Sequence, residues 1–323
     1  MILVTGGTGF LGSELIRQLL LNEKKVRAIK RVGSRIPKLL EKEENIEWVN
    51  ADILDYFSIK EAMEGVSRVY HCAAIVSFNA SDRKKMYKVN VEGTTNLLNI
   101  SMENNLSRFL HVSSIAALGD SKKDELITED NQWEFSSEQS HYSITKYESE
   151  MEVFRAAAEG LNAVIVNPSI IIGKNAGREG SGQLFEKIRT GLSYYPGGSS
   201  GYVDVEDVAK AMIMLMNSDI NDERFIINSE NRTYKEIFTE AALNFGKTPP
   251  TIALRFWMMY FILLGTRLIT MLGGKKFSLT RETAISAFKK SKYSNEKIKK
   301  ALNLDFKPVS DSIREICIQL NTK

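Results

Sequence analysis

Cysteine is scarce in this sequence, and the two cysteines, Cys72 and Cys317, lie far apart. They match none of the spacings at which cysteines bind a metal ion, so the sequence predicts no metal site. So few thiols in a chain of 323 residues are typical of a reducing compartment, where disulfides are rare. We expect two ordinary buried thiols.

An excess of charge of one sign is also absent. The chain has 43 basic and 40 acidic residues, which leaves a formal net charge of +3. Nucleic-acid-binding proteins usually carry a marked basic excess. We therefore expect no nucleic-acid partner.

Long apolar runs are missing as well. Residues 256–265 are apolar throughout and bracketed by Arg255 and Arg267, but this run is too short to span a bilayer. Our first interpretation of the segment 255–272 is a buried helix that lines an apolar substrate pocket. The alternative is a helix that makes peripheral contact with a membrane or a partner. The chain opens directly on a strand and a glycine turn, which leaves no room for a signal peptide and predicts a cytoplasmic protein.

What is present describes an ordinary globular protein, with 43% hydrophobic and 26% charged residues. The length exceeds the usual span of one hydrophobic core, so we expect a large domain with a smaller appendage.

The first motif is a strand, a tight turn and a helix. The apolar run 2–4 stops at a glycine-rich turn, after which leucine and isoleucine recur at helical spacing. Gly7, Gly9 and Gly12 match G-x-G-x-x-G, while Gly6, Gly9 and Gly12 match the looser G-x-x-G-x-x-G. Glycines permit the turn and the close approach of a pyrophosphate, and the helix N-terminus supplies amide donors. The turn predicts a dinucleotide site.

The second strand, 26–29, ends in Lys30 and Arg31, where a NAD-binding protein commonly places an acidic residue for the ribose 2′-hydroxyl. Two cations suit a 2′-phosphate instead, so we prefer NADP(H). In the alternative, both side chains are solvated and the protein uses NAD(H) or both cofactors.

Short apolar strands then alternate with helical segments, which favours an α/β fold with a doubly wound parallel sheet. The strands that we expect are 46–50, 66–72, 109–112, 163–166 and 225–227. The part from Lys174 to Gly201 is predicted to be irregular apart from a helix at 183–189, and to cover the substrate. Helical patterns dominate after 228, so we expect a smaller, mainly helical C-terminal region.

Ligands of an open parallel sheet bind beyond the carboxyl ends of its strands. Asp52 follows one strand and could accept a hydrogen bond from an adenine, although it could equally cap the next helix. Ala73 and Ala74 follow another strand and are small enough to let a cofactor pass the backbone. Ser114 follows a third strand, where a serine is often only a turn or cap residue.

Tyr142 and Lys146 are four residues apart in a segment rich in helix-forming residues, so both can point into one site. A nearby cation favours the phenolate, so we expect Lys146 to lower the pKa of Tyr142 and allow proton transfer near neutral pH. An isolated pair of this kind also occurs by chance on surface helices.

Taken together, the motifs resemble the extended short-chain dehydrogenase/reductase family, also called the NAD-dependent epimerase/dehydratase family. The resemblance covers nearly the whole chain and implies a Rossmann fold. It rests on residues 5–12, 52–55, 71–74, 90–94, 112–114, Tyr142 with Lys146, and 167–169.

The resemblance also implies roles. Tyr142 would be the general acid/base, Lys146 would tune it and contact the nicotinamide ribose, and Ser114 would bind the substrate oxygen. Asn90 is a weaker match that could be structural. The residues implied in cofactor binding are Gly6, Gly9, Phe10, Leu11, Gly12, Lys30, Arg31, Asp52, Ile53, Ala73, Ala74, Tyr142, Lys146, Pro168, Ser169 and Ile170. Residues 1–173, joined by 202–228, would bind the dinucleotide, and 174–201 with 229–323 would bind the substrate.

Within the family, the stretch 196–209 is similar to the dihydroflavonol-4-reductase and 3β-hydroxysteroid dehydrogenase branch, whose substrates are apolar ketones or alcohols. Many nucleotide-sugar members place an arginine in this region, and residues 196–204 contain none. Arg178 and Arg189 leave a nucleotide-sugar epimerase or dehydratase open as the alternative. A non-enzymatic dinucleotide-sensing protein is a third reading, although such proteins typically lack the tyrosine and lysine. The family often forms homodimers, so the resemblance admits a homodimer, while the sequence itself leaves the oligomeric state open.

Overall fold

The computed structural model of the protein describes residues 1–119, 125–136, 138–177, 180–258 and 280–322. Its centre is a seven-stranded sheet in the order β11-β7-β5-β4-β1-β2-β3, and each neighbouring pair of strands is parallel. The strands are β1 (Ile2–Thr5), β2 (Val26–Lys30), β3 (Ile46–Asn50), β4 (Arg68–His71), β5 (Arg108–Val112), β7 (Ala163–Pro168) and β11 (Glu223–Ile227). The sheet confirms the predicted doubly wound α/β fold.

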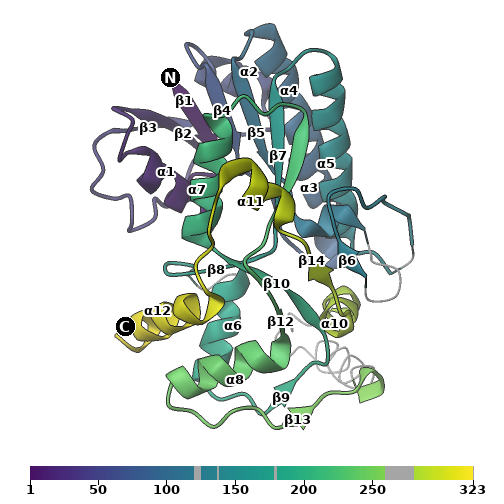
Figure 1. Ribbon diagram of the computed structural model, residues 1–323. Coiled ribbons are helices and arrows are strands. Elements are labelled where there is room, and N and C mark those ends of the chain that lie inside the picture. Colours follow the sequence, from purple (N-terminus) through teal and green to yellow (C-terminus); the bar gives the residue numbers. More distant parts are fainter. Residues whose placement is uncertain (120–124, 137, 178–179, 259–279, 323) are drawn as a thin grey trace.

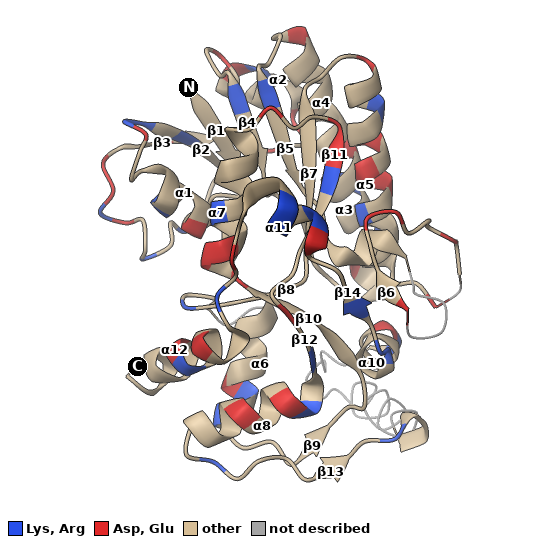
Figure 2. Ribbon diagram, viewed as in Figure 1, with Lys and Arg blue, Asp and Glu red and all other residues tan. Residues whose placement is uncertain are grey.

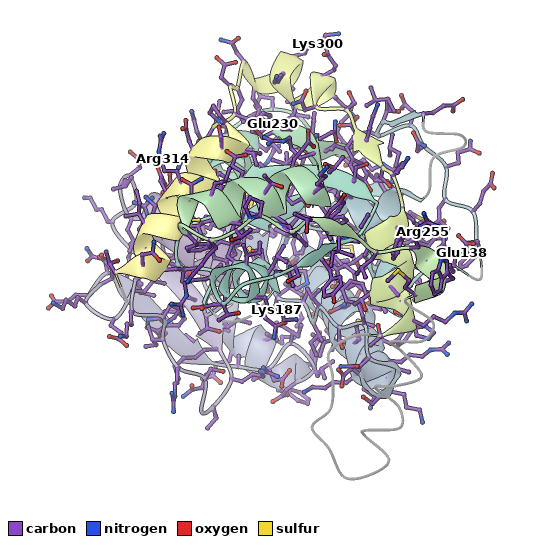
Figure 3. All side chains as sticks on the ribbon, turned by 90° about the horizontal axis from the view of Figure 1, so that it is seen from below. Glu138, Lys187, Glu230, Arg255, Lys300 and Arg314 are labelled. Atoms are coloured by element: carbon purple, nitrogen blue, oxygen red, sulfur yellow. The ribbon has the colours of Figure 1, made fainter. Side chains whose placement is uncertain are left out.

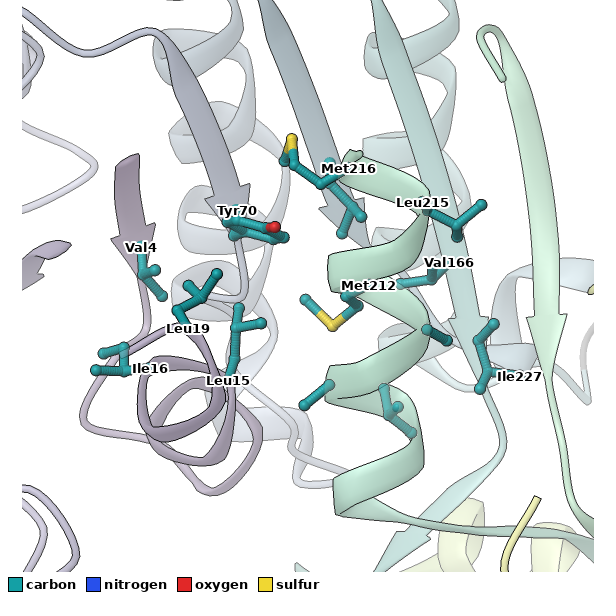
Figure 4. Close-up of a cluster of buried hydrophobic side chains, with 14 of the residues drawn as sticks. Val4, Leu15, Ile16, Leu19, Tyr70, Val166, Met212, Leu215, Met216 and Ile227 are labelled. Atoms are coloured by element: carbon teal, nitrogen blue, oxygen red, sulfur yellow. The ribbon is translucent and has the colours of Figure 1, made fainter. Parts of the chain in front are cut away.

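Helices cover both faces of this sheet (Figure 1). On one face, α1 (Phe10–Leu19) and α7 (Val205–Met216) share a buried cluster with β1, β4 and β7. Figure 4 shows Leu15 and Met212 pointing into this layer. On the other face, α2 (Tyr56–Ala62), α4 (Gly93–Glu103) and α5 (His141–Ala158) form a second cluster with β3, β5 and β7. Because strands covered on both faces must be apolar on both, they appear in the sequence as continuous apolar runs.

A smaller part lies beyond the carboxyl ends of the strands, in the lower half of Figure 1. It contains a three-stranded sheet in the order β12-β10-β8. The strands are β8 (Ile170–Ile172), β10 (Ser199–Asp204) and β12 (Glu230–Thr233), and the helices are α6 (Gly180–Arg189), α8 (Tyr234–Asn244) and α12 (Val309–Asn321). These helices share a separate hydrophobic cluster with β8 and β10.

Two short parallel pairs and three more helices complete the described chain. They are β6 (Leu126–Ile127) with β14 (Lys292–Tyr293), β9 (Tyr194–Tyr195) with β13 (Ile252–Ala253), α3 (Arg83–Tyr87), α10 (Arg281–Phe288) and α11 (Glu296–Leu302).

The segment predicted to be irregular, 174–201, is where the sequence prediction is wrong. It contains β9 and the start of β10, in addition to α6. A Cβ on Gly201 would lie 2.3 Å from Oδ1 of Asn228 and 2.9 Å from Cβ of Ser169. Gly201 therefore serves close packing within a strand, which composition alone cannot distinguish from a loop.

The region 202–228 is divided between the two sheets. Residues 202–204 belong to β10, whereas α7 and β11 lie with the seven-stranded sheet. The division of the chain into cofactor-binding and substrate-binding regions stays a prediction.

Among the described residues, no helix combines the length and the hydrophobicity needed to cross a membrane. Most of the segment 255–272 lies outside the described residues, because the description stops at 258 and resumes at 280. The choice between a pocket-lining and a membrane-contacting helix therefore stays open. Phe256 and Trp257, at its start, are exposed.

Candidate active site

The glycine turn joins β1 to α1 in a tightly packed corner. Gly6 has a φ of +67°, and a Cβ there would lie 2.7 Å from the backbone of Cys72 and Ala73. A Cβ on Gly12 would lie 2.2 Å from the carbonyl oxygen of Gly6. α1 begins at Phe10 behind Gly9, with no side chain capping it, so its first amide groups are left to a phosphate.

A buried chain of hydrogen bonds links this turn to the end of β4. The Thr5 hydroxyl accepts a bond from the Ala73 amide (3.1 Å) and lies 2.7 Å from Nδ1 of His71. Nε2 of His71 lies 2.9 Å from the Thr94 hydroxyl. Burial lowers the pKa of His71 to about 3, so the ring is neutral and bridges two hydroxyl groups.

The network of hydrogen bonds continues to the helix that carries Tyr142. Asn90 lies in a π-helical turn (Lys88–Glu92) between α3 and α4. Its side chain exchanges two hydrogen bonds with the backbone of Ile75 and donates to the Thr145 hydroxyl (3.1 Å). That hydroxyl donates to the Tyr142 carbonyl oxygen (2.9 Å). Sequence analysis missed Thr5 and Thr145 as links of this network, because a hydroxyl partner distant in sequence leaves no local pattern.

The ends of β2 and β3 carry the residues predicted near the adenosine. Lys30 donates to the Asn50 side chain (2.9 Å), and Arg31 is exposed. Asp52 accepts a bond from the Leu54 amide (3.0 Å), whereas α2 is capped by Asp55. The helix-cap alternative for Asp52 is therefore wrong.

The neighbouring residue in this predicted adenine site is Ile53. It is buried, and a Cβ on Gly93 would lie 2.7 Å from its Cδ1. Its side chain therefore packs directly against the start of α4.

Tyr142 lies in the first turn of α5, which the Ser140 hydroxyl caps by accepting a bond from the Ser143 amide (3.0 Å). Ser114 lies just beyond β5, where its hydroxyl accepts a bond from the Ala116 amide (3.2 Å) and is close enough to the phenol to lower its pKa. Burial raises the pKa of Tyr142, and the bond with Ser114 lowers it by less. The structure thus brings Ser114 and Tyr142 together, but the expected lowering of the tyrosine pKa is wrong.

Lys146 is 2% exposed, and its ammonium group donates to the Val112 carbonyl oxygen (2.7 Å) at the end of β5. Burial lowers its pKa to about 8, while the nearby Glu150 and Cys72 act in the opposite direction. The cation is therefore fixed on the strand end that leads to Ser114.

Phe78 closes the other side of the phenol. Its ring centroid lies 6.0 Å from that of Tyr142, in an edge-to-face arrangement. The two rings give the site an apolar wall. Neither the motifs nor the spacing of the sequence pointed to Phe78.

The chain passes from the large sheet to the small one at Pro168, Ser169 and Ile170. Pro168 ends β7 and Ile170 begins β8. The Ser169 hydroxyl between them is buried and has no hydrogen-bond partner among the described residues. This orphaned hydroxyl and the uncapped start of α1 fit a bound dinucleotide, whose phosphates α1 would hold and whose nicotinamide end Ser169 would contact.

Comparison with known proteins agrees with this geometry. The model of the NAD dependent epimerase/dehydratase family matches residues 2–228. The chain belongs to this family. It is an enzyme of the short-chain dehydrogenase/reductase type, and its cofactor is a nicotinamide dinucleotide.

Two curated proteins are similar to this chain over most of its length. It is 32% identical over 256 residues to "Sterol demethylase protein B" of Methylococcus capsulatus, covering 78% of this chain and 76% of the relative. It is 30% identical over 261 residues to "Putative dihydroflavonol 4-reductase" of Synechocystis sp., covering 79% and 75%.

Among solved structures, the UDP-glucose 4-epimerase of Thermotoga maritima with UDP-glucose superposes with a TM-score of 0.80. The match covers 99% of this chain and 98% of that one at 21% identity, so it shows the fold alone.

Proposed function

We propose that this enzyme reduces the carbonyl group of a small or medium apolar substrate with NADPH, or oxidises the corresponding secondary alcohol. The observation that carries the proposal is the placement of Ser114 beside the phenol of Tyr142, with the Lys146 cation bound to the strand end that leads to Ser114. Bound NADPH would supply the hydride. Side chains of the protein transfer the proton and stabilise the charges that develop.

Tyr142 donates its phenolic proton to the carbonyl oxygen as the hydride reaches the carbonyl carbon. Ser114 donates a hydrogen bond to the same oxygen and stabilises the negative charge that develops there. The Lys146 cation stabilises the phenolate that remains. Because burial raises the pKa of Tyr142, the phenol is protonated at neutral pH, which favours reduction.

NADP(H) is the cofactor that Lys30 and Arg31 support. Both cations stand at the end of β2, where a 2′-phosphate would lie, and Arg31 is exposed enough to reach it. Lys30 is already hydrogen-bonded to Asn50, so Arg31 would carry most of the preference.

An apolar substrate is supported by the aromatic wall of Phe78 and by the absence of arginine from residues 196–204. The relative named as a putative dihydroflavonol 4-reductase is in keeping with this class. In the nucleotide-sugar alternative, Arg189 would hold the diphosphate. Its guanidinium is instead paired with Glu186 on the same helix (2.9 Å), and Arg178 lies outside the described residues.

The test is turnover of Tyr142→Phe with a panel of apolar ketones and NADPH. We expect a loss of about 10²-fold or more, with unchanged NADPH affinity in a fluorescence titration. Tyr147→Phe is the matched control, because Tyr147 lies on the same helix but stacks on Trp133 (4.6 Å). Retained turnover in Tyr142→Phe would contradict the mechanism. Stabilisation by UDP-sugars or dTDP-sugars, but by no ketone, would favour the epimerase or dehydratase.

The cytoplasmic location and the homodimer stay predictions. Size-exclusion chromatography with light scattering tests the dimer directly.

A further inference from the structure

Glu150 is a fully buried carboxylate on the helix of the catalytic residues. Its exposed fraction is 0%, and it stands one turn beyond Lys146, as Lys146 stands one turn beyond Tyr142. The three residues therefore share one face of α5. The mechanism above gives Glu150 no role, yet burying a carboxylate is costly unless it has partners.

Two side chains from neighbouring strands bind this carboxylate. Nδ2 of Asn167, in β7, donates to Oε1 at 2.5 Å, and a guanidinium nitrogen of Arg224, in β11, lies 3.2 Å from Oε2. Asn167 also donates to the carbonyl oxygen of Ser114 (3.0 Å). Through Asn167, Glu150 is connected to the backbone of the residue that binds the substrate oxygen.

The partners of Glu150 favour its ionised form, whereas burial, which is the largest influence, opposes it. Burial raises the pKa of the carboxyl group, while Ser113, Arg224 and Asn167 lower it. Nδ2 of Asn167 and the guanidinium of Arg224 are both donors, which suits a carboxylate. Arg224 is held independently, because it also donates to the carbonyl oxygens of Glu129 (2.9 Å) and Asn131 (3.0 Å).

Glu150 is the principal negative charge near Lys146. Of the other titratable groups that face the ammonium, His71 and His111 are neutral because burial lowers their pKa values. Cys72 is a neutral thiol, because burial raises its pKa to about 12. Burial favours the uncharged amine, and Glu150 is the largest influence in the opposite direction.

We infer that Glu150 is a positioning residue: its carboxylate keeps Lys146 cationic and, through Asn167, holds the Ser114 backbone in register with Tyr142. The inference rests on the proposed function, because it assigns Glu150 to the same proton-transfer site. The inference has two parts: the charge of Glu150 acts on Lys146, and its hydrogen bond to Asn167 acts on the position of the Ser114 backbone.

Two substitutions separate these effects. Glu150→Gln removes the charge but keeps an oxygen that can accept the bond from Asn167. Arg224 keeps its two carbonyl partners in this variant, so the fold is expected to persist. Glu150→Asp keeps the charge but withdraws the carboxylate from Asn167 by one methylene. Glu152→Gln is the matched control, because Glu152 lies on the same helix and pairs with Arg155 instead (3.0 Å).

The readout is an NMR titration of protein labelled with ¹³C at the lysine Cε, in which Lys146 is the signal absent from Lys146→Met. We expect the wild-type signal to titrate near pH 8. In Glu150→Gln the midpoint should fall by about one pH unit or more, because an opposite charge has been removed from the neighbourhood. Glu150→Asp and Glu152→Gln should keep the wild-type midpoint.

The pH profile of kcat gives a second readout. The alkaline limb of Glu150→Gln should move to lower pH with the lysine midpoint, whereas Glu150→Asp should lose kcat evenly at all pH values. An unchanged midpoint in Glu150→Gln would overturn the inference. So would a midpoint in Glu150→Asp that falls by about one pH unit or more below the wild-type value. This comparison needs only the wild type, so it holds even when Glu150→Gln fails to fold. Absence of ketone turnover in the wild type would contradict the proposed function alone, since the titration needs no substrate.

Discussion

Polar side chains are used differently at the catalytic edge of the large sheet and in the C-terminal region. At the catalytic edge, His71, Lys146 and Glu150 are almost fully buried, and each has partners on other elements. In the C-terminal region, charged groups pair at the surface, as Arg232 does with Glu240 (2.9 Å). Figure 2 shows charges distributed along the outer helices, and Figure 3 shows Lys300 and Arg314 toward the margin of the molecule.

This difference determines how tightly each region is specified. A buried polar group without its partner is strongly destabilising, so the catalytic edge tolerates one geometry. A surface ion pair contributes little and can be exchanged without changing the fold. The region proposed to perform the chemistry is therefore fixed, and the region expected to select the substrate is free to vary.

The largest expected effect is the loss of the Lys146 cation. In Lys146→Met, kcat should fall by about 10²- to 10⁴-fold, because the cation proposed to stabilise the tyrosinate is then lost. Lys187→Met, on a partly exposed helix of the small part, is the control and should keep wild-type kcat. A Lys146→Met enzyme with near-normal kcat would show that the buried edge is structural only. Steady-state kinetics with a confirmed ketone substrate checks this.

The second expected effect is acid destabilisation by the two buried histidines. Folding keeps His71 and His111 neutral, with pKa values far below the ordinary value of 6.5. The unfolded chain binds these protons once the pH falls below about 6.5, so stability falls with decreasing pH. At pH 5 the loss amounts to about 2 kcal/mol for each histidine, relative to pH 8.

Urea unfolding at the two pH values measures this loss. His111→Gln should lose about half of the pH dependence that these two histidines cause. If that variant keeps the full pH dependence, His111 is not among the buried groups that resist protonation.

The same contrast explains how much could be predicted from the sequence. The parallel sheet, the glycine turn and the pair Tyr142 and Lys146 follow local patterns of period and spacing, and the structure forms the first two as predicted. The link from Thr5 to Thr145 and the contact of Glu150 with Arg224 join residues from distant elements, so no window of the sequence contains them. The start of β10 was not predicted, because Gly201 is needed there for close packing against Asn228 and Ser169, and a sequence pattern does not reveal such contacts.

The pKa of Tyr142 teaches the same lesson at a single residue. The spacing of Lys146 predicted a cation that lowers this pKa, but spacing contains no information on burial. Burial is the larger influence on the phenol, and it acts in the opposite direction.

A smaller effect is expected at Arg31, on the exposed margin of the cofactor site. Arg31→Ala should raise the KM for NADPH by about tenfold, as expected for one charge-assisted bond to a phosphate, and leave the KM for NADH unchanged. Arg35→Ala, four residues further along, is the control. Equal changes for both cofactors would contradict the assignment of Arg31 to the 2′-phosphate.

The smallest effect is expected in the C-terminal region. Arg232→Gln removes the surface pairs with Glu230 and Glu240, and should lower the free energy of unfolding by about 1 kcal/mol or less. Chemical denaturation measures it. A loss of several kcal/mol would show that these ion pairs matter as much as the buried polar groups, and would contradict the difference between the two regions.

The most direct test of the account is a crystal structure of the enzyme with NADP⁺ bound. We predict the pyrophosphate at the start of α1, the 2′-phosphate within hydrogen-bond distance of Arg31, and the nicotinamide ribose beside Tyr142 and Lys146. A nicotinamide ring bound away from Tyr142 and Ser114 would contradict the proposed chemistry.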